Sequence, residues 1–212
     1  MKLILIESLE QRELLSSAAI VNGTLVVRGD DNRPNIIGVT MNGSSRKIAV
    51  TVNGRMTRFS ELPTEKVNIN GGNRNDLIIF HGNKLAGKIY GIGLSGWDGN
   101  DFIVSSSDAR VDHNGGSGND VLVSGSSGDW LQGDDGNDLL IGNGGSDTIS
   151  PGTGNDRIFA GSGDDFIYAV PDETDIIDGG TGNDTIWSYG LTPIKSSFSN
   201  VELVDYDNTA FA

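Results

Sequence analysis

The chain has 212 residues, no cysteine and a formal net charge of −14. The lack of cysteine excludes disulfides, thiolate metal sites and a cysteine nucleophile. The negative charge argues against nucleic acids and anionic membranes as partners, and no apolar run in the sequence is long enough to span a bilayer.

Residues 1–20 read as a separate N-terminal segment with the character of an export or sorting signal. MKLILI is too short for the apolar region of a signal peptide, and acidic residues follow it at once. Leu9 to Ser16 resembles the LEPR-XLL motif at the N-termini of exported planctomycete proteins, with Gln11 in place of the usual proline. The alternative is a short amphipathic helix that packs its leucines on the first strands.

Residues 21–70 predict antiparallel or irregular β-structure. Alternating runs such as TLVVRG and KIAVTV are separated by Asn-Gly pairs that begin at Asn22, Asn42 and Asn53. Such pairs favour the positive φ angles of a two-residue hairpin turn. The segment RGDDNRPNIIGV resembles a degenerate copy of the repeat that follows, and units at Gly71 and Gly96 preserve more of that repeat.

A nine-residue unit dominates the second half of the chain. It repeats six times without slipping from Gly115 to Tyr168, and a seventh copy starts at Gly179 after a ten-residue unit. Each copy has Asp at position 6 and Ile or Leu at position 8. Residues 111–187 contain fourteen Asp, one Glu and one Arg, so this segment alone carries a charge of −14. Since a disordered acidic tail would not place Ile and Leu at a constant offset from Asp, the pattern predicts a folded repeat.

The unit predicts a tight turn followed by a short strand. Glycines supply the turn, and the Asn at position 5 is expected to adopt the left-handed region. The residue at position 8 points inward between outward neighbours. Two units, about 18 residues, complete one coil of a solenoid, so the aspartates form two columns. The first column is Asp101, Asp120, Asp138, Asp156 and Asp175, and the second is Asp129, Asp147, Asp165 and Asp184.

Stacked carboxylates repel unless a cation lies between them. Calcium fits because it accepts six to eight oxygens in a flexible shell that turn carbonyls can complete, whereas magnesium demands a smaller octahedron. One Ile or Leu per unit gives a core only one side chain thick, and its burial does not offset the conformational entropy lost when nine residues become ordered. We therefore expect calcium binding to contribute folding free energy.

Residues 96–187 resemble the RTX, or haemolysin-type, calcium-binding repeat with its GGxGxDxUx consensus. The resemblance implies an all-β, right-handed parallel β-roll, several Ca2+ ions between stacked turns, and secretion to the exterior of a bacterial cell or to its surface. The expected metal ligands are the nine column aspartates and the turn glycines Gly116, Gly118, Gly136, Gly145, Gly154, Gly163 and Gly182. Ser124, Pro151 and Ala160 replace the leading glycine, and Ser127 replaces the glycine at position 4, so sites that use those turns are expected to be weaker.

The expected organisation is an export- or sorting-like segment (1–20), an N-terminal β region (21–70), a β-roll (71–187, best formed over 96–187) and a C-terminal capping strand region (188–212). His81 and His113 are interpreted as solvated residues in linking turns rather than catalytic groups. The repeat register places the side chain of Trp130 on the outer surface. There it could either cover an adjacent turn or stack on a ligand. Without an insertion between Gly115 and Tyr168, we expect a flat face rather than a pocket.

The leading hypothesis is a non-catalytic, extracellular calcium-binding β-roll that folds on binding Ca2+ and serves as a structural or adhesive surface module. Its partner would be a cell-surface or matrix macromolecule, not nucleic acid or a membrane interior. Two alternatives are an accessory module of a secreted enzyme system and a calcium-dependent ice-binding protein. The first lacks room for an enzyme domain before the repeats, and the second lacks an unbroken row of threonines at position 3.

Overall fold

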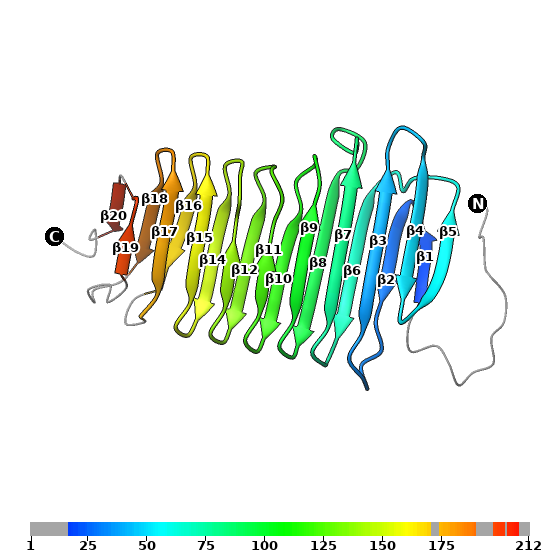
Figure 1. Cartoon of the computed structure of the whole chain (residues 1–212), viewed down its shortest axis with the longest axis horizontal. Helices are drawn as coiled ribbons and strands as arrows, with labels where there is room; N and C mark the ends of the chain where they lie inside the picture. Colours follow the sequence, from blue (N-terminus) through cyan, green and yellow to red (C-terminus); the bar gives the residue numbers. More distant parts are fainter. Residues whose placement is uncertain (1–16, 171–173, 190–196, 202, 208–212) are drawn as a thin grey trace.

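The computed structural model describes residues 17–170, 174–189, 197–201 and 203–207. These residues form 20 β-strands and no helix, arranged as two ten-stranded sheets that face each other along an elongated solenoid (Figure 1). The predicted all-β parallel β-roll is therefore confirmed. The LEPR-XLL-like motif at Leu9 to Ser16 lies outside the described residues.

From β6 onward the two sheets take alternate strands of the chain, whereas β1 and β2 both lie in sheet A and β3 to β5 all lie in sheet B. Sheet A runs in the order β1 (Ser17–Val21), β2 (Thr24–Arg28), β6 (Lys66–Gly72), β8 (Gly91–Asp98), β10 (Asp112–Ser117), β12 (Trp130–Asp135), β14 (Thr148–Thr153), β16 (Phe166–Ala169), β18 (Thr185–Tyr189) and β20 (Leu203–Asp207). Sheet B runs in the order β5 (Arg55–Phe59), β4 (Lys47–Val52), β3 (Ile36–Asn42), β7 (Leu77–Asn83), β9 (Phe102–Ser106), β11 (Val121–Val123), β13 (Leu139–Ile141), β15 (Arg157–Ser162), β17 (Ile176–Thr181) and β19 (Ser197–Ser199).

Neighbouring coils stack with their repeat positions in register. Leu122 pairs with Leu140 in sheet B, and Leu131 pairs with Ile149 in sheet A, so each coil spans two nine-residue units. The two ten-residue units, residues 105–114 and 169–178, lengthen their coils by one residue without shifting the register, because Ile103 still pairs with Leu122 and Ile158 with Ile177. The inward position 8 is thereby preserved along the whole roll.

The N-terminal region joins the solenoid directly. Strands β2 and β3 pair in parallel with β6 and β7, while β1 and the β4–β5 hairpin add antiparallel strands at the end of each sheet. The turns at Asn22-Gly23 and Asn53-Gly54 have positive φ at both residues, as predicted. The prediction for Asn42-Gly43 is wrong. There β3 ends at Asn42 and a four-residue turn, with positive φ at Arg46, leads to β4.

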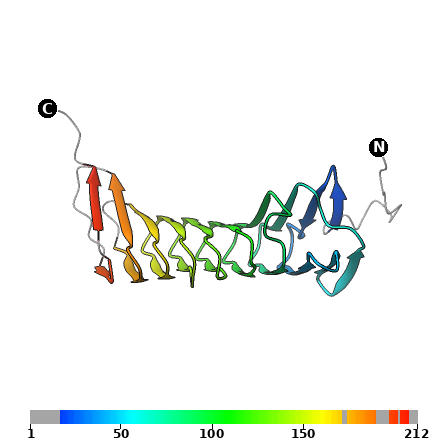
Figure 2. The ribbon, with the colours of Figure 1, turned by 90° about the horizontal axis from the view of Figure 1, so that it is seen from above.

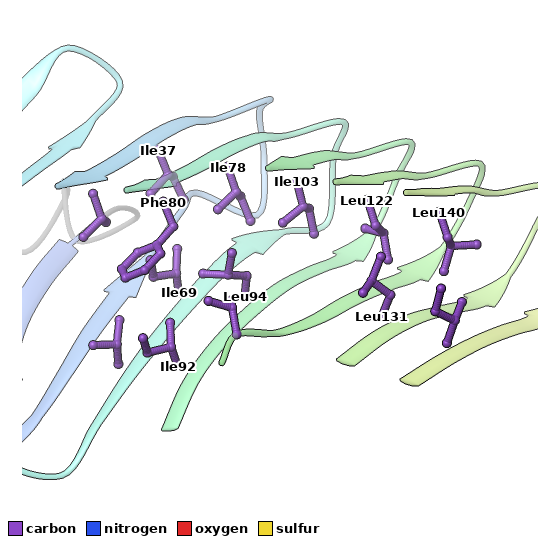
Figure 3. Packing of buried hydrophobic residues seen from close by; sticks show 14 of the residues in the cluster. Ile37, Ile69, Ile78, Phe80, Ile92, Leu94, Ile103, Leu122, Leu131 and Leu140 are labelled. Carbon is purple, nitrogen blue, oxygen red and sulfur yellow. The ribbon is translucent and has the colours of Figure 1, made fainter. Parts of the chain in front are cut away.

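The core lies between the sheets and becomes thinner toward the C-terminus. Strands β2, β3, β4, β6 and β7 each bury two or three apolar side chains, such as Ile78 and Phe80 in β7, whereas β11 and β13 bury only Leu122 and Leu140 (Figure 3). Viewed from above, the N-terminal end is also visibly wider than the repeats (Figure 2). The two halves of the roll therefore differ in how much apolar burial supports them.

The two histidines lie on strands, so their assignment to linking turns is wrong. His81 is exposed on β7, whereas His113 is 2 % exposed on β10, in the inward row between Leu94 and Leu131. Its Nε2 lies 3.0 Å from the buried Oγ of Ser105. Because the ten-residue unit keeps register, it places an imidazole where other coils have an aliphatic side chain, and burial lowers the pKa of His113 to about 4.

The outward strand positions separate into two kinds of surface. The outward residues of sheet B are mainly apolar from β7 to β13, and those of sheet A are mainly polar from β6 to β14. A groove of about 330 Å3 also lies on sheet A. The groove lies mainly on β6, β8 and β10, before the uninterrupted repeat of 115–168, at a place where Gly93 leaves a gap in an outward row.

Candidate calcium sites

The aspartates at position 6 lie in two buried columns along the roll, with the membership expected from the register. In the first column the Oδ1 atom of each Asp accepts a hydrogen bond from the backbone N–H of the Asp in the preceding coil, as from Asp120 to Asp138 at 2.8 Å. The second column repeats this contact, with Asp147 N–H donating to Asp165 Oδ1 at 2.8 Å. The column aspartates are at most 2 % exposed.

The structure adds one aspartate that sequence reasoning left out of the columns. Asp76, 3 % exposed, accepts the N–H of Asn35 and donates its own N–H to Asp101 Oδ1 at 2.6 Å. Its unit, GGNRNDLII, kept Asp at position 6, so the same spacing rule identifies it. The first column therefore begins one coil earlier than predicted.

The second carboxylate oxygen is the unusual feature of these columns. Oδ2 is buried and has no hydrogen-bond partner at Asp76, Asp101, Asp120, Asp138, Asp147, Asp165 and Asp184. Where the unit begins with glycine, Oδ2 points at that residue. A Cβ at Gly115 would overlap with Asp120 Oδ2, and one at Gly133 would overlap with Asp138 Oδ2. A leading glycine is favoured there because the carboxylate occupies the space beside its Cα.

Burial makes these carboxylates difficult to ionise in the absence of a cation. It raises the pKa of Asp120 to about 6, of Asp138 to about 7 and of Asp147 to about 8. The backbone N–H bonds lower the pKa, but they offset only part of the desolvation, and neighbouring aspartates such as Asp134 raise it further. A bound cation would reverse this balance by stabilising the ionised form.

The donor set fits calcium better than other metals. Among the described residues, no three carboxylate or imidazole side chains converge on one point, so backbone carbonyls must complete any shell. The carbonyl oxygen of Gly133, in the next coil, also lies close to the place beside Gly115 that Asp120 Oδ2 approaches. Carboxylate and carbonyl oxygens in a flexible shell are the ligands of Ca2+, and the orphaned buried oxygens are the groups it would satisfy.

A comparison with protein families gives a match in the segment that contains most of the two aspartate columns. The RTX calcium-binding nonapeptide repeat (4 copies) matches residues 114–149, 142–169 and 172–190. This segment belongs to the RTX calcium-binding repeat family. RTX repeats bind Ca2+ ions and form β-rolls, which agrees with the buried aspartate columns.

The RTX match also bears on activity and location. RTX repeats are typically non-catalytic structural modules and are typical of secreted bacterial proteins. No curated protein and no solved structure matches the chain. Within the part of the chain that the structure describes, no helix could cross a membrane.

The RTX turns obtain their shape from positions 2 and 4, and the expectation for position 5 is wrong. Gly116 (position 2) has φ of 106° and Gly118 (position 4) has φ of 134°, whereas none of the described asparagines at position 5 has positive φ. The seven glycines expected to contribute ligands all have positive φ. A Cβ at Gly136 would overlap with the carbonyl oxygen of Gly118, so the position-4 backbones stack in close contact.

The RTX asparagines at position 5 form a second ladder, which the sequence analysis missed. The Oδ1 atom of Asn119 accepts the N–H of Asn137 at 2.7 Å, and Asn137 accepts the N–H of Asn155 at 2.8 Å. On the opposite edge Asp164 accepts the N–H of Asn183 at 2.9 Å. The recurrence of Asn was the available signal, but a turn preference explained it equally well from the sequence alone.

One RTX unit departs from this arrangement at the place where its glycine is displaced. In SGSSGDWLQ, Asp129 Oδ2 accepts the N–H of Gly125 at 3.1 Å, and the Oγ of Ser124 donates to the carbonyl of Gly142 at 2.5 Å. The second oxygen of Asp129 is therefore already engaged. This local difference supports the expectation that a site using this turn is weaker.

Proposed function

We propose that the chain is an extracellular calcium-binding β-roll that folds on binding Ca2+ and acts as a structural or adhesive module at a bacterial surface. The observation that carries the proposal is the set of buried Oδ2 atoms without hydrogen-bond partners. The proposed ligands are the carboxylates of both columns, with Asp76 added to the first. Carbonyl oxygens of the seven turn glycines complete the proposed set: Gly116, Gly118, Gly136, Gly145, Gly154, Gly163 and Gly182.

The energetic reason for calcium-linked folding is the combination of thin core and buried charge. Each repeat strand such as β13 buries one large aliphatic side chain, Leu140. Nearby, Asp138 must either take up a proton or remain ionised without solvent. Calcium supplies the missing counter-charge, so its binding free energy becomes folding free energy.

Titration of the purified protein tests this proposal. Circular dichroism and calorimetry should show that Ca2+ raises the β signal and the melting temperature, and that EGTA lowers both. Magnesium at the same concentration is the control and should have a much smaller effect. An unchanged signal and melting temperature after EGTA would contradict calcium-linked folding.

The proposed module has no enzymatic activity of its own. Among the residues that the structure describes, His113 and Ser105 form the only hydrogen-bonded His–Ser pair. Both residues are at most 4 % exposed, so a substrate could not reach them. Esterase, protease and polysaccharide-lyase substrates should therefore give background rates. Turnover abolished by His81→Ala or His113→Ala would contradict this part of the proposal.

A further inference from the structure

The groove on the outer face of sheet A crosses β6, β8, β10 and β12, which lie side by side in the middle of the roll (Figure 1). We name it the Gly93 groove. Its lining consists mainly of uncharged polar side chains and one indole, contributed by Asn68, Asn70, Ser95, Asn114, Trp130 and Gln132.

The groove exists because an outward row of side chains is interrupted by a glycine. Along this row, Asn68 pairs with Gly93, Gly93 with Asp112, and Asp112 with Trp130. A Cβ built on Gly93 would meet nothing closer than Asn68 Oδ1 at 3.7 Å. Gly93 is therefore not required by crowding, and its φ is not positive, so its effect is to leave the space open.

The amides on one side of the groove are held in place before any ligand binds. Asn114 Nδ2 donates to Asp134 Oδ2 at 2.6 Å, and Gln132 Nε2 donates to Asp134 Oδ1 at 2.5 Å. Ser95 Oγ lies 3.4 Å from Asn114 Oδ1. Such fixed side chains lose little conformational entropy when they bind a ligand.

The indole gives the groove an apolar wall. Trp130 is 42 % exposed, and the guanidinium of Arg110 lies 5.8 Å from its ring centroid. Arg110 Nε also lies 3.0 Å from Asp112 Oδ1, so the guanidinium offsets the negative charge of this carboxylate at the rim of the groove. Trp130 thus combines an accessible apolar surface with neighbours that restrain it.

We propose that the Gly93 groove binds a neutral glycan chain. Fixed amides and hydroxyls match the hydroxyl groups of sugars, and the indole matches the apolar face of a pyranose ring. The surrounding repeats carry the whole net charge of −14, which repels anionic polysaccharides and nucleic acids. An extended peptide would add to a free sheet edge, but these four strands are each paired on both sides.

This inference rests on the proposed function, since it names the kind of partner that the adhesive role would need. It also depends on the folded roll, because the lining comes from four strands in separate stretches of the chain. Binding is therefore expected only in the presence of calcium.

Calorimetric titration at saturating calcium tests the inference with cellohexaose, maltohexaose, laminarihexaose and chitohexaose as probes. We expect at least one hexaose to bind. Gly93→Val should fill the groove, and Trp130→Ala should remove its wall, so each should weaken that binding at least tenfold. Gly38→Val is the matched control, because Gly38 faces outward on β3 of sheet B and a Cβ there meets nothing within 4 Å.

Circular dichroism of each protein with calcium separates this inference from the proposed function. A wild-type chain that does not fold with calcium overturns the proposed function. A chain that folds but binds none of the four hexaoses overturns the glycan site alone. Binding that survives Gly93→Val, or that polygalacturonate displaces, also overturns it.

Discussion

Asp138 shows how one buried residue combines two roles through its two oxygens. Oδ1 accepts the N–H of Asp120 and so joins neighbouring coils, while Oδ2 has no hydrogen-bond partner and is placed to bind calcium. Asp135, in the same turn, is exposed, and its side chain accepts the hydroxyl of Thr153 at 3.0 Å. The two aspartates share a turn, but only one of them is committed to a column.

We predict that Asp138→Asn weakens calcium binding without removing the hydrogen bond between coils. An amide keeps an oxygen that can accept the N–H of Asp120 and loses the charge, so the calcium concentration at half-folding should rise about tenfold, or ~1.4 kcal/mol. Asp135→Asn makes the same charge change at the surface and should leave it nearly unchanged. Equal shifts in a calcium titration followed by circular dichroism would contradict the two-role assignment.

We predict that His113 makes the roll sensitive to acid. Its folded pKa of about 4 lies below the usual 6.5, so the unfolded chain binds more protons between these values and stability falls as pH drops from 6.5 to 4. The loss is on the order of 3 kcal/mol. The variant His113→Leu with Ser105→Ala should lose less stability over this window. Urea denaturation of the wild-type chain and the double variant at saturating calcium measures this difference in the free energy of unfolding. The aspartates titrate in both proteins, so their contribution cancels in the comparison.

At the scale of the repeat element, side-chain ladders connect the turns on both sides. The Asp ladder runs inside the roll and the Asn ladder runs along its exposed edge, and in both a side-chain oxygen accepts a backbone N–H of the adjacent coil. These bonds satisfy turn N–H groups that the strand ladders do not reach. They therefore fix the register of adjacent turns without using the Oδ2 atoms that are proposed to bind calcium.

We predict that Asn137→Ala destabilises the calcium-bound roll by about 1 kcal/mol, because the N–H of Asn155 loses its acceptor. Asn137→Asp should restore most of this loss, since Asp164 fills the equivalent role on the opposite edge. Thermal unfolding at saturating calcium measures both variants. If Asn137→Asp is as unstable as Asn137→Ala, position 5 acts through backbone preference and not through the ladder.

At the scale of the whole molecule, we predict that calcium removal loosens the two ends of the roll unequally. The N-terminal coils bury residues such as Met41, Phe80 and Leu85, whereas the repeats depend on single aliphatic side chains. Hydrogen exchange after EGTA should therefore show lost protection over 96–187 and retained protection over β2 to β7. Uniform loss along the chain would indicate that the coils unfold as one cooperative unit.

The sequence by itself determined the repeat, the inward row and the two columns, because a strict nine-residue period leaves one way to stack coils with Leu140 and Asp138 in register. It could not determine where each Oδ2 points, that Asn137 bonds the next coil, or that His113 is buried. The direction of Oδ2 depends on the shape of the folded turn, and the other two features depend on contacts between residues 18 positions apart, which exist only once coils are stacked. The Gly93 groove is likewise a property of the assembled sheet. The space above Gly93 becomes a groove only when Asn68 and Asp112 lie on either side of it on the neighbouring strands.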